Sequence, residues 1–122
     1  MPRKLNPEEL ASFNSYHKAG GGNLNRCKIN NISLSLHETD EHNLKMIEIC
    51  KEYYSKGYNF ITEAVPNDNK KRRIDIVILG LDGNYKKGGL WIEIETDKRR
   101  MKPDADISYV LENGEWKVYI KE

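Results

Sequence analysis

The hydrophobic residues between positions 39 and 57 recur at helical spacing. Thr39 can cap a first turn, and the acidic residues directly after it suit the positive end of a helix dipole. The pattern predicts a helix over residues 39–56 that ends at Gly57 and packs its apolar stripe on a sheet. The stripe consists of Leu44, Ile47, Cys50 and Tyr54.

Three segments that follow this helix are rich in β-branched and aromatic residues, which favour strands. They cover residues 58–65, 73–79 and 90–95 and are separated by runs of Asn, Asp, Gly and Pro, which form turns. The connections are too short for crossover helices, so we expect the strands to pair in a mixed or antiparallel sheet. The element order of this part of the chain is therefore α-β-β-β.

The patterns near the two ends of the chain are weaker. Asn6, with proline and two glutamates after it, predicts a short helix from Pro7 to about Lys18, which the glycines of residues 19–23 stop. Residues 31–36 alternate weakly and fit either a short strand or an extended lead-in. Close to the C-terminus, Asn113-Gly114 separates two alternating segments, 107–111 and 116–120, and predicts a closing β-hairpin.

These elements predict one α/β (α+β) domain over residues 1–122, with a helix, a three-stranded sheet and a C-terminal β-hairpin. A chain that is 38% hydrophobic and 32% charged suits a single core. No apolar run approaches the roughly 20 residues of a membrane span, and the N-terminus lacks the apolar stretch of a secretory signal. We therefore expect a cytoplasmic protein with no membrane partner, in which Cys27 and Cys50 remain thiols.

Alternation along the predicted strands gathers carboxylates on one side of the sheet. If the apolar triplets of the second and third strands face the core, Asp75, Glu93 and Glu95 share the other face. Carboxylates that lie so close repel one another unless a cation or an arginine balances them, and oxygen-rich sites suit Mg²⁺ or Mn²⁺. A solvated polar face neutralised by Arg73 and lysines fits the spacing equally well. The triplets are Ile74, Ile76 and Ile78, and Leu90, Ile92 and Ile94.

Basic residues are concentrated near the ends of the strands that carry these acids. The formal net charge is only +1, but half of the 20 Lys and Arg residues fall in the three short clusters 70–73, 86–87 and 98–102. Cations beside a metal site would suit the phosphate backbone of a nucleic acid, whereas charged loops that only maintain solubility are the ordinary alternative. The residues expected to bind nucleic acid are Lys70, Lys71, Arg72, Arg73, Arg99 and Arg100.

Residues 37–98 contain four short motifs: Glu41-His42, Gly57-Tyr58 before a strand that ends in Glu63, Arg73-Ile74-Asp75, and Ile92-Glu93-Ile94-Glu95. Together these motifs resemble the PD-(D/E)XK nuclease superfamily, in particular its small archaeal-type domains. The resemblance implies a restriction-endonuclease-like core over these residues, with residues 1–36 as an N-terminal extension and residues 99–122 as the closing hairpin. It also implies Mg²⁺-dependent hydrolysis of DNA phosphodiester bonds.

The resemblance assigns roles to individual positions. Asp75 and Glu93 would hold the metal, with Glu63 as an outer ligand. The lysine of the family motif is replaced by Glu95, which would then be a further ligand, and Lys98 is the candidate for a displaced lysine. The helix that usually follows the third strand is not evident in this sequence. A carboxylate of the first core helix would assist, which gives Glu41 and Glu48 auxiliary roles, and the Glu41-His42 motif adds His42 to them.

Two functions of different classes follow from these observations. One is a metal-dependent DNA endonuclease, supported by the three retained carboxylates. The other is a nuclease-like fold that binds nucleic acid or protein without cleavage, supported by the missing motif lysine. A scaffold subunit that uses the closing hairpin as an assembly edge is a third possibility. We also expect a homodimer, because so small a domain offers little surface to grip a duplex.

Overall fold

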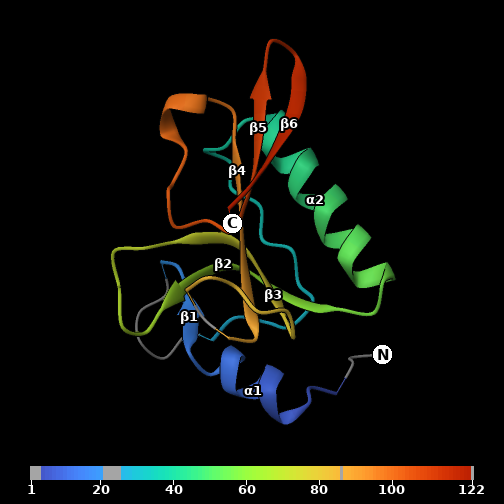
Figure 1. Cartoon of the computed structure of the whole chain (residues 1–122), viewed down its shortest axis with the longest axis vertical. Coiled ribbons are helices and arrows are strands. Elements are labelled where there is room, and N and C mark those ends of the chain that lie inside the picture. The colour runs from blue at the N-terminus through green and yellow to red at the C-terminus, as the bar shows by residue number, and fades with distance from the viewer. Residues whose placement is uncertain (1–3, 21–25, 86, 122) are drawn as a thin grey trace.

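The structure is a computed structural model that describes residues 4–20, 26–85 and 87–121 (Figure 1). The α+β class is confirmed, and the three predicted strands form the centre, β2 to β4, of a larger, mixed six-stranded sheet. The helices are α1 (Pro7–Phe13), α2 (Asp40–Ser55) and the short 3₁₀ helix η1 (Lys98–Arg100). The strands are β1 (Tyr16–Lys18), β2 (Asn59–Pro66), β3 (Ile74–Leu79), β4 (Gly89–Glu95), β5 (Ile107–Glu112) and β6 (Glu115–Ile120).

Strand order in the sheet follows the chain, from β1 at one edge to β6 at the other. All neighbouring strands pair antiparallel except β4 and β5, which pair in parallel with Ile92 opposite Ile107. Two parallel neighbouring strands need a connection that brings the chain back to the end of the sheet at which the first of them began. The segment that contains η1 makes this return and carries residues 96–106 past the end of β4 (Figure 1).

The N-terminal helix is shorter than the sequence predicted. It begins as expected, with Asn6 and Glu9 forming a reciprocal capping box, but it ends at Phe13 rather than near Lys18. The chain then turns and forms β1, which pairs with β2 and places Tyr16 opposite Pro66. This pairing joins residues far apart in the sequence, so the local pattern of hydrophobic and polar residues does not reveal it. The glycines predicted to stop the helix lie within residues 19–23, and residues 21–23 of this segment lie outside the described residues.

Residues 31–36 form no strand. Residues 31–35 have no regular secondary structure and lie beside β2, where the Ser33 amide donates to the Thr62 hydroxyl and that hydroxyl donates to the Asn31 carbonyl. Of the two possibilities that the sequence left open, the short strand is therefore wrong. Both cysteines are free and buried, as expected.

Helix α2 has nearly the predicted bounds, with Thr39 as its cap, but a different face turned to the sheet. Leu44 is 67% exposed, so the predicted stripe is wrong at that position. The polar His42 belongs to the inward face because its ring meets Asp75 on β3, and this orientation turns Leu44 to solvent. The buried face consists of His42, Met46, Ile49 and Cys50.

Both faces of the central strands are covered, which corrects the expectation of one core face and one open polar face. One cluster packs under α2, and a second includes Phe13 of α1 on the opposite side. Ile76 and Ile78 belong to the α2 cluster, but Ile74 belongs to the other. The change of side coincides with an irregularity in β2, where Glu63 has a φ of 50° and is missing from the ladder with β3, although the register is the same on both sides of it.

Within the described parts of the chain, no helix is both long and apolar enough to cross a membrane.

Candidate functional site

A polar pocket of about 370 Å³ opens at the place where β3 and β4 stop pairing. The last pair of the ladder on that side is Ile76 with Ile92, and the next residues along, Asp75 and Glu93, are not paired with each other. Both of these carboxylates line the pocket, together with Glu95, so the structure brings the three predicted acids to one place.

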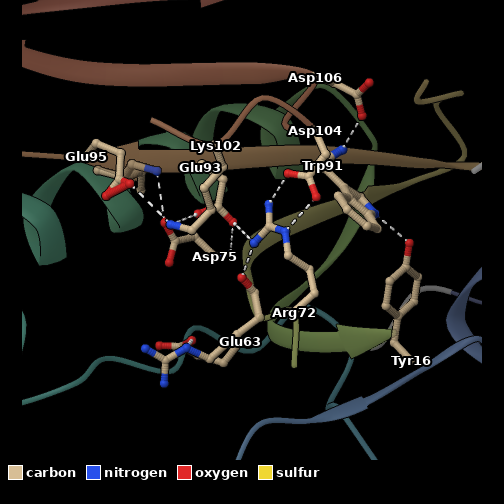
Figure 2. Close-up of polar contacts among 12 residues, drawn as sticks. Tyr16, Glu63, Arg72, Asp75, Trp91, Glu93, Glu95, Lys102, Asp104 and Asp106 are labelled. Atoms are coloured by element: carbon tan, nitrogen blue, oxygen red, sulfur yellow. Dashed lines mark hydrogen bonds and ion pairs between the residues drawn. The ribbon is translucent and has the colours of Figure 1, made fainter. Parts of the chain in front are cut away.

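Asp75 and Glu93 hold each other in place through the main chain. A Glu93 carboxylate oxygen accepts the Asp75 amide at 3.1 Å, and Asp75 Oδ2 accepts the Ile94 amide at 2.9 Å (Figure 2). Buried amides need acceptors, and here two side chains replace the hydrogen bonds that the ladder no longer supplies. The positions of both carboxylates are therefore fixed by the opposite strand.

Two cations balance the acids. Lys102 Nζ lies 3.3 Å from Glu93 Oε2 and 3.2 Å from Glu95 Oε2, and Arg72 Nη1 lies 3.2 Å from Glu93 Oε1 (Figure 2). Burial, followed by the charge of Asp75, raises the pKa of Glu93 to about 7 despite these partners. The site therefore holds one carboxyl group that can change its charge near neutral pH.

The lysine that contacts Glu93 and Glu95 is Lys102 and not Lys98, the residue that the sequence suggested. Lys98 Nζ lies 3.5 Å from Glu112 and over the Tyr119 ring, and it does not line the pocket. The 3₁₀ turn of η1 directs the chain away from β4 before it returns, so Lys102 reaches the glutamates instead. Sequence spacing could not reveal this, because the path of a loop after a strand is set by tertiary contacts.

Arg72 lies inside the site rather than on its surface. Its guanidinium forms two hydrogen bonds to Asp104, at 2.9 and 2.8 Å, in addition to the ion pair with Glu93. It also lies over the ring of Trp91, 5.3 Å from the centroid. Arg72 was expected to bind nucleic acid, but its donors are largely occupied by carboxylates of the protein, which makes it a support for Glu93.

Trp91 is part of the support behind the site. It is 1% exposed, and its indole nitrogen donates to the Tyr16 hydroxyl at 2.7 Å (Figure 2). Tyr85 packs on its ring, with the ring centroids 4.4 Å apart. Strand alternation over residues 90–95 places Trp91 on the side of the carboxylates, which predicts that it packs against the closing hairpin or stacks a base. The structure places it in the α1 cluster instead, because both sheet faces are covered.

A second group of side chains flanks Asp75 on the α2 side. His42 Nε2 lies 3.4 Å from Asp75 Oδ2 and 3.9 Å from Glu38 Oε2. Burial lowers the pKa of His42, but the hydrogen bond and charge of Asp75 outweigh it and raise the pKa overall. Glu63 pairs with Arg73 at 3.3 Å, and burial raises the pKa of this carboxyl. Glu38 was not predicted, and only its position four residues before His42 could have indicated it.

The other predicted residues divide between the pocket and the outer surface. The pocket lining includes Lys71, Arg73 and Arg100 but not Lys70 or Arg99. Arg99 pairs with Asp97. Of the two glutamates expected to assist from α2, Glu41 is exposed and Glu48 pairs at the surface with Lys45. Neither lines the pocket, whereas His42 does.

Among the described residues, no group of three or more His, Cys, Asp or Glu side chains is arranged to hold a metal ion. Glu63, the expected outer ligand, is turned to Arg73. Asp75 and Glu93 remain as a pair of neighbouring carboxylates. In each carboxylate, one oxygen accepts fewer hydrogen bonds than the second oxygen of the same group. Asp75 Oδ1 has no protein donor among the described residues, and Glu93 Oε2 accepts a hydrogen bond from Lys102 alone among them.

We expect the free energy of unfolding to decrease from pH 5 to pH 8. Between about pH 4.5 and 7 the folded chain keeps a proton on Glu93 that the unfolded chain has released, so stability is lost as the pH rises. His42, whose pKa is also raised above 6.5, contributes in the same direction. Urea unfolding at both pH values measures this.

The matched variant for this measurement is Glu93→Gln, which should flatten the dependence because, of the described residues, His42 and Glu63 are then the ones with a raised pKa in this range. A wild-type chain that becomes more stable between pH 5 and 8 would contradict the assignment of a raised pKa to Glu93.

Comparisons with protein families, curated proteins and solved structures find no match for this chain.

Proposed function

We propose that the chain is a nuclease of the PD-(D/E)XK type that uses Mg²⁺ or Mn²⁺ to hydrolyse DNA phosphodiester bonds. One observation supports this above the others: Asp75 and Glu93 meet where two strands separate, and Lys102 contacts both Glu93 and Glu95 in the same pocket. An acid pair with an adjacent lysine is the chemistry that the motif resemblance implies. The restriction-endonuclease-like core is part of the same proposal.

The donor set fits a hard divalent cation. Mg²⁺ is commonly bound by one or two carboxylates, with water and substrate phosphate completing its shell, so a third protein acid is not required. Asp75 Oδ1 is without a protein donor among the described residues, and burial together with the charge of Asp75 raises the pKa of Glu93, so a cation placed between the two acids would favour the ionised form of Glu93. When bound, the ion would polarise the scissile phosphate and make a coordinated water more acidic.

Residues of the chain itself would supply positioning and charge. His42 lies behind Asp75 and orients its carboxylate, as partners of metal ligands commonly do. Lys102 would hold a water or a phosphate oxygen beside Glu93 and Glu95. Lys71 and Arg100 on the pocket lining would attract the phosphate backbone.

The second candidate is a nucleic-acid-binding module of the same fold without cleavage. The observation in its favour is that Arg72 and Lys102 already neutralise Glu93, so the fold does not depend on a metal to balance its acids. The presence of Glu95 at the position of the motif lysine also favours a module that does not cleave. This candidate predicts DNA binding that is insensitive to divalent cations.

Lys102→Ala and Lys98→Ala form a matched pair that tests the proposal. We expect Lys102→Ala to lower the rate of plasmid cleavage in Mg²⁺ or Mn²⁺ by about 10- to 100-fold. Lys98→Ala should cleave like the wild type, because Lys98 lies against Glu112 and Tyr119, away from the acids. EDTA should stop cleavage in all three proteins.

The same assay separates the two candidates. A wild-type chain that binds DNA but does not cut it in either metal would exclude the nuclease and favour the binding module. Equal losses of rate in both lysine variants would show that Lys102 has no particular role in the site.

A further inference from the structure

The outer edge of β6 is open. β6 is the last strand of the sheet, and among the described residues only β5 pairs with it. Its side chains Val118 and Ile120 are 53% and 69% exposed. The tip of the β5–β6 hairpin extends beyond both helices in Figure 1. An exposed apolar edge strand is a template for pairing with another chain.

The hairpin turn determines which backbone groups of β6 face outward. Asn113 and Gly114 form a two-residue turn with φ values of 52° and 78°, closed by the pair Glu112 and Glu115. In such a hairpin the closing pair exchanges both hydrogen bonds, and every second residue along the strand does the same. The Lys121 amide donates inward to the Asp106 carbonyl at 2.9 Å, which fits this alternation.

The residues between the inward-bonding positions direct their backbone groups away from β5. These residues are Trp116, Val118 and Ile120, so each presents one amide and one carbonyl at the open edge. Antiparallel pairing of two identical edges about a two-fold axis at Val118 would satisfy all of these groups. Trp116 would lie opposite the partner's Ile120, and each Val118 opposite its own copy.

Charge complementarity selects this register. With the axis at Val118, Glu115 lies opposite the partner's Lys121, an acid against a base on both sides of the axis. An axis at Lys117 would place two lysines directly opposite each other, and an axis at Tyr119 would place Lys117 against the partner's Lys121. Like charges in directly opposed positions are destabilising, so of these three central registers only the one with its axis at Val118 is self-complementary.

We propose that β6 is the docking edge for a second copy of this chain, which joins two six-stranded sheets into one continuous sheet. The interface is isologous, with the two-fold axis through Val118. It rests on the edge strand alone and is independent of the proposed nuclease chemistry. An edge contact of this kind buries little surface, so the dimer forms reversibly in the micromolar to millimolar range of chain concentration.

Sedimentation equilibrium of the full chain, from about 10 μM to 1 mM, tests the proposal. The wild type should dimerise, and Val118→Lys should raise the dissociation constant about tenfold or more because it places two lysines on the axis. Leu44→Lys is the matched control, since Leu44 is 67% exposed on the outer side of α2. It should leave the dissociation constant unchanged. A wild-type monomer throughout, or equal association of both variants, overturns the proposal.

A charge exchange tests the register. Glu115→Lys should raise the dissociation constant about tenfold, and the double variant Glu115→Lys with Lys121→Glu should return it to the wild-type value. The Lys121 ammonium also donates to the Pro103 carbonyl at 2.8 Å, so circular dichroism must show an unchanged fold in the double variant. A folded double variant that stays dissociated overturns the axis at Val118.

Discussion

We expect Asp75→Asn to remove the proposed metal-dependent cleavage, with a loss of about a thousandfold in rate, and to leave the fold intact. Asparagine keeps an oxygen that can accept the Ile94 amide, so the contact between β3 and β4 survives. The charge that a divalent cation would need is lost. The measurements are plasmid cleavage in Mg²⁺ and Mn²⁺ and a calorimetric titration with Mn²⁺ in the absence of DNA.

Glu48→Gln is the control for this variant. It removes another carboxylate that the sequence analysis assigned to the site. Because Glu48 pairs with Lys45 at the surface, its loss should not affect cleavage. If the acids form only a structural cluster, Asp75→Asn instead relieves repulsion with Glu93 and slightly stabilises the chain. Equal and negligible Mn²⁺ heats in the wild type and in Asp75→Asn would contradict the metal site and the nuclease with it.

Arg72→Ala should lower the free energy of unfolding by about 3 kcal/mol, because it leaves the buried Glu93 with Lys102 as its one remaining cation. It also removes both hydrogen bonds to Asp104. Urea unfolding measures the loss. The loss should be smaller at pH 5 than at pH 8, because Glu93 is protonated below its pKa of about 7 and then needs less compensation.

Arg73→Ala is the neighbouring control. The Arg73 side chain is 56% exposed and pairs with Glu63, so its loss should cost less than about 1 kcal/mol. Equal destabilisation by the two variants would show that Arg72 is not a specific support of the site.

Local pattern in the sequence predicted the elements better than their partners. The bounds of α2 and of the three central strands follow from capping residues, periodicity and turn residues, all of which act within a few positions. β1 was missed because Tyr16 to Lys18 becomes a strand only by pairing with β2. The inward face of α2 was missed because it depends on His42 meeting Asp75, a polar contact that hydrophobic periodicity ignores.

The candidate site shows the same division. The convergence of Asp75, Glu93 and Glu95 followed from strand alternation and the adjacency of β3 and β4. Lys102 and Arg72 could not be assigned in this way, because both lie on loops whose paths depend on tertiary contacts.

The reciprocal hydrogen bonds of Asp75 and Glu93 make two main-chain amides sensitive to the charge of the carboxylates in the site. The Asp75 amide donates to one carboxylate and the Ile94 amide to the other, so each amide proton is polarised by the charge of the side chain that receives it. Protonation of Glu93, or the arrival of a cation between the acids, alters that polarisation without any movement of the strands. The NMR chemical shifts of the Asp75 and Ile94 amides should therefore report the charge of Glu93 and of Asp75, respectively.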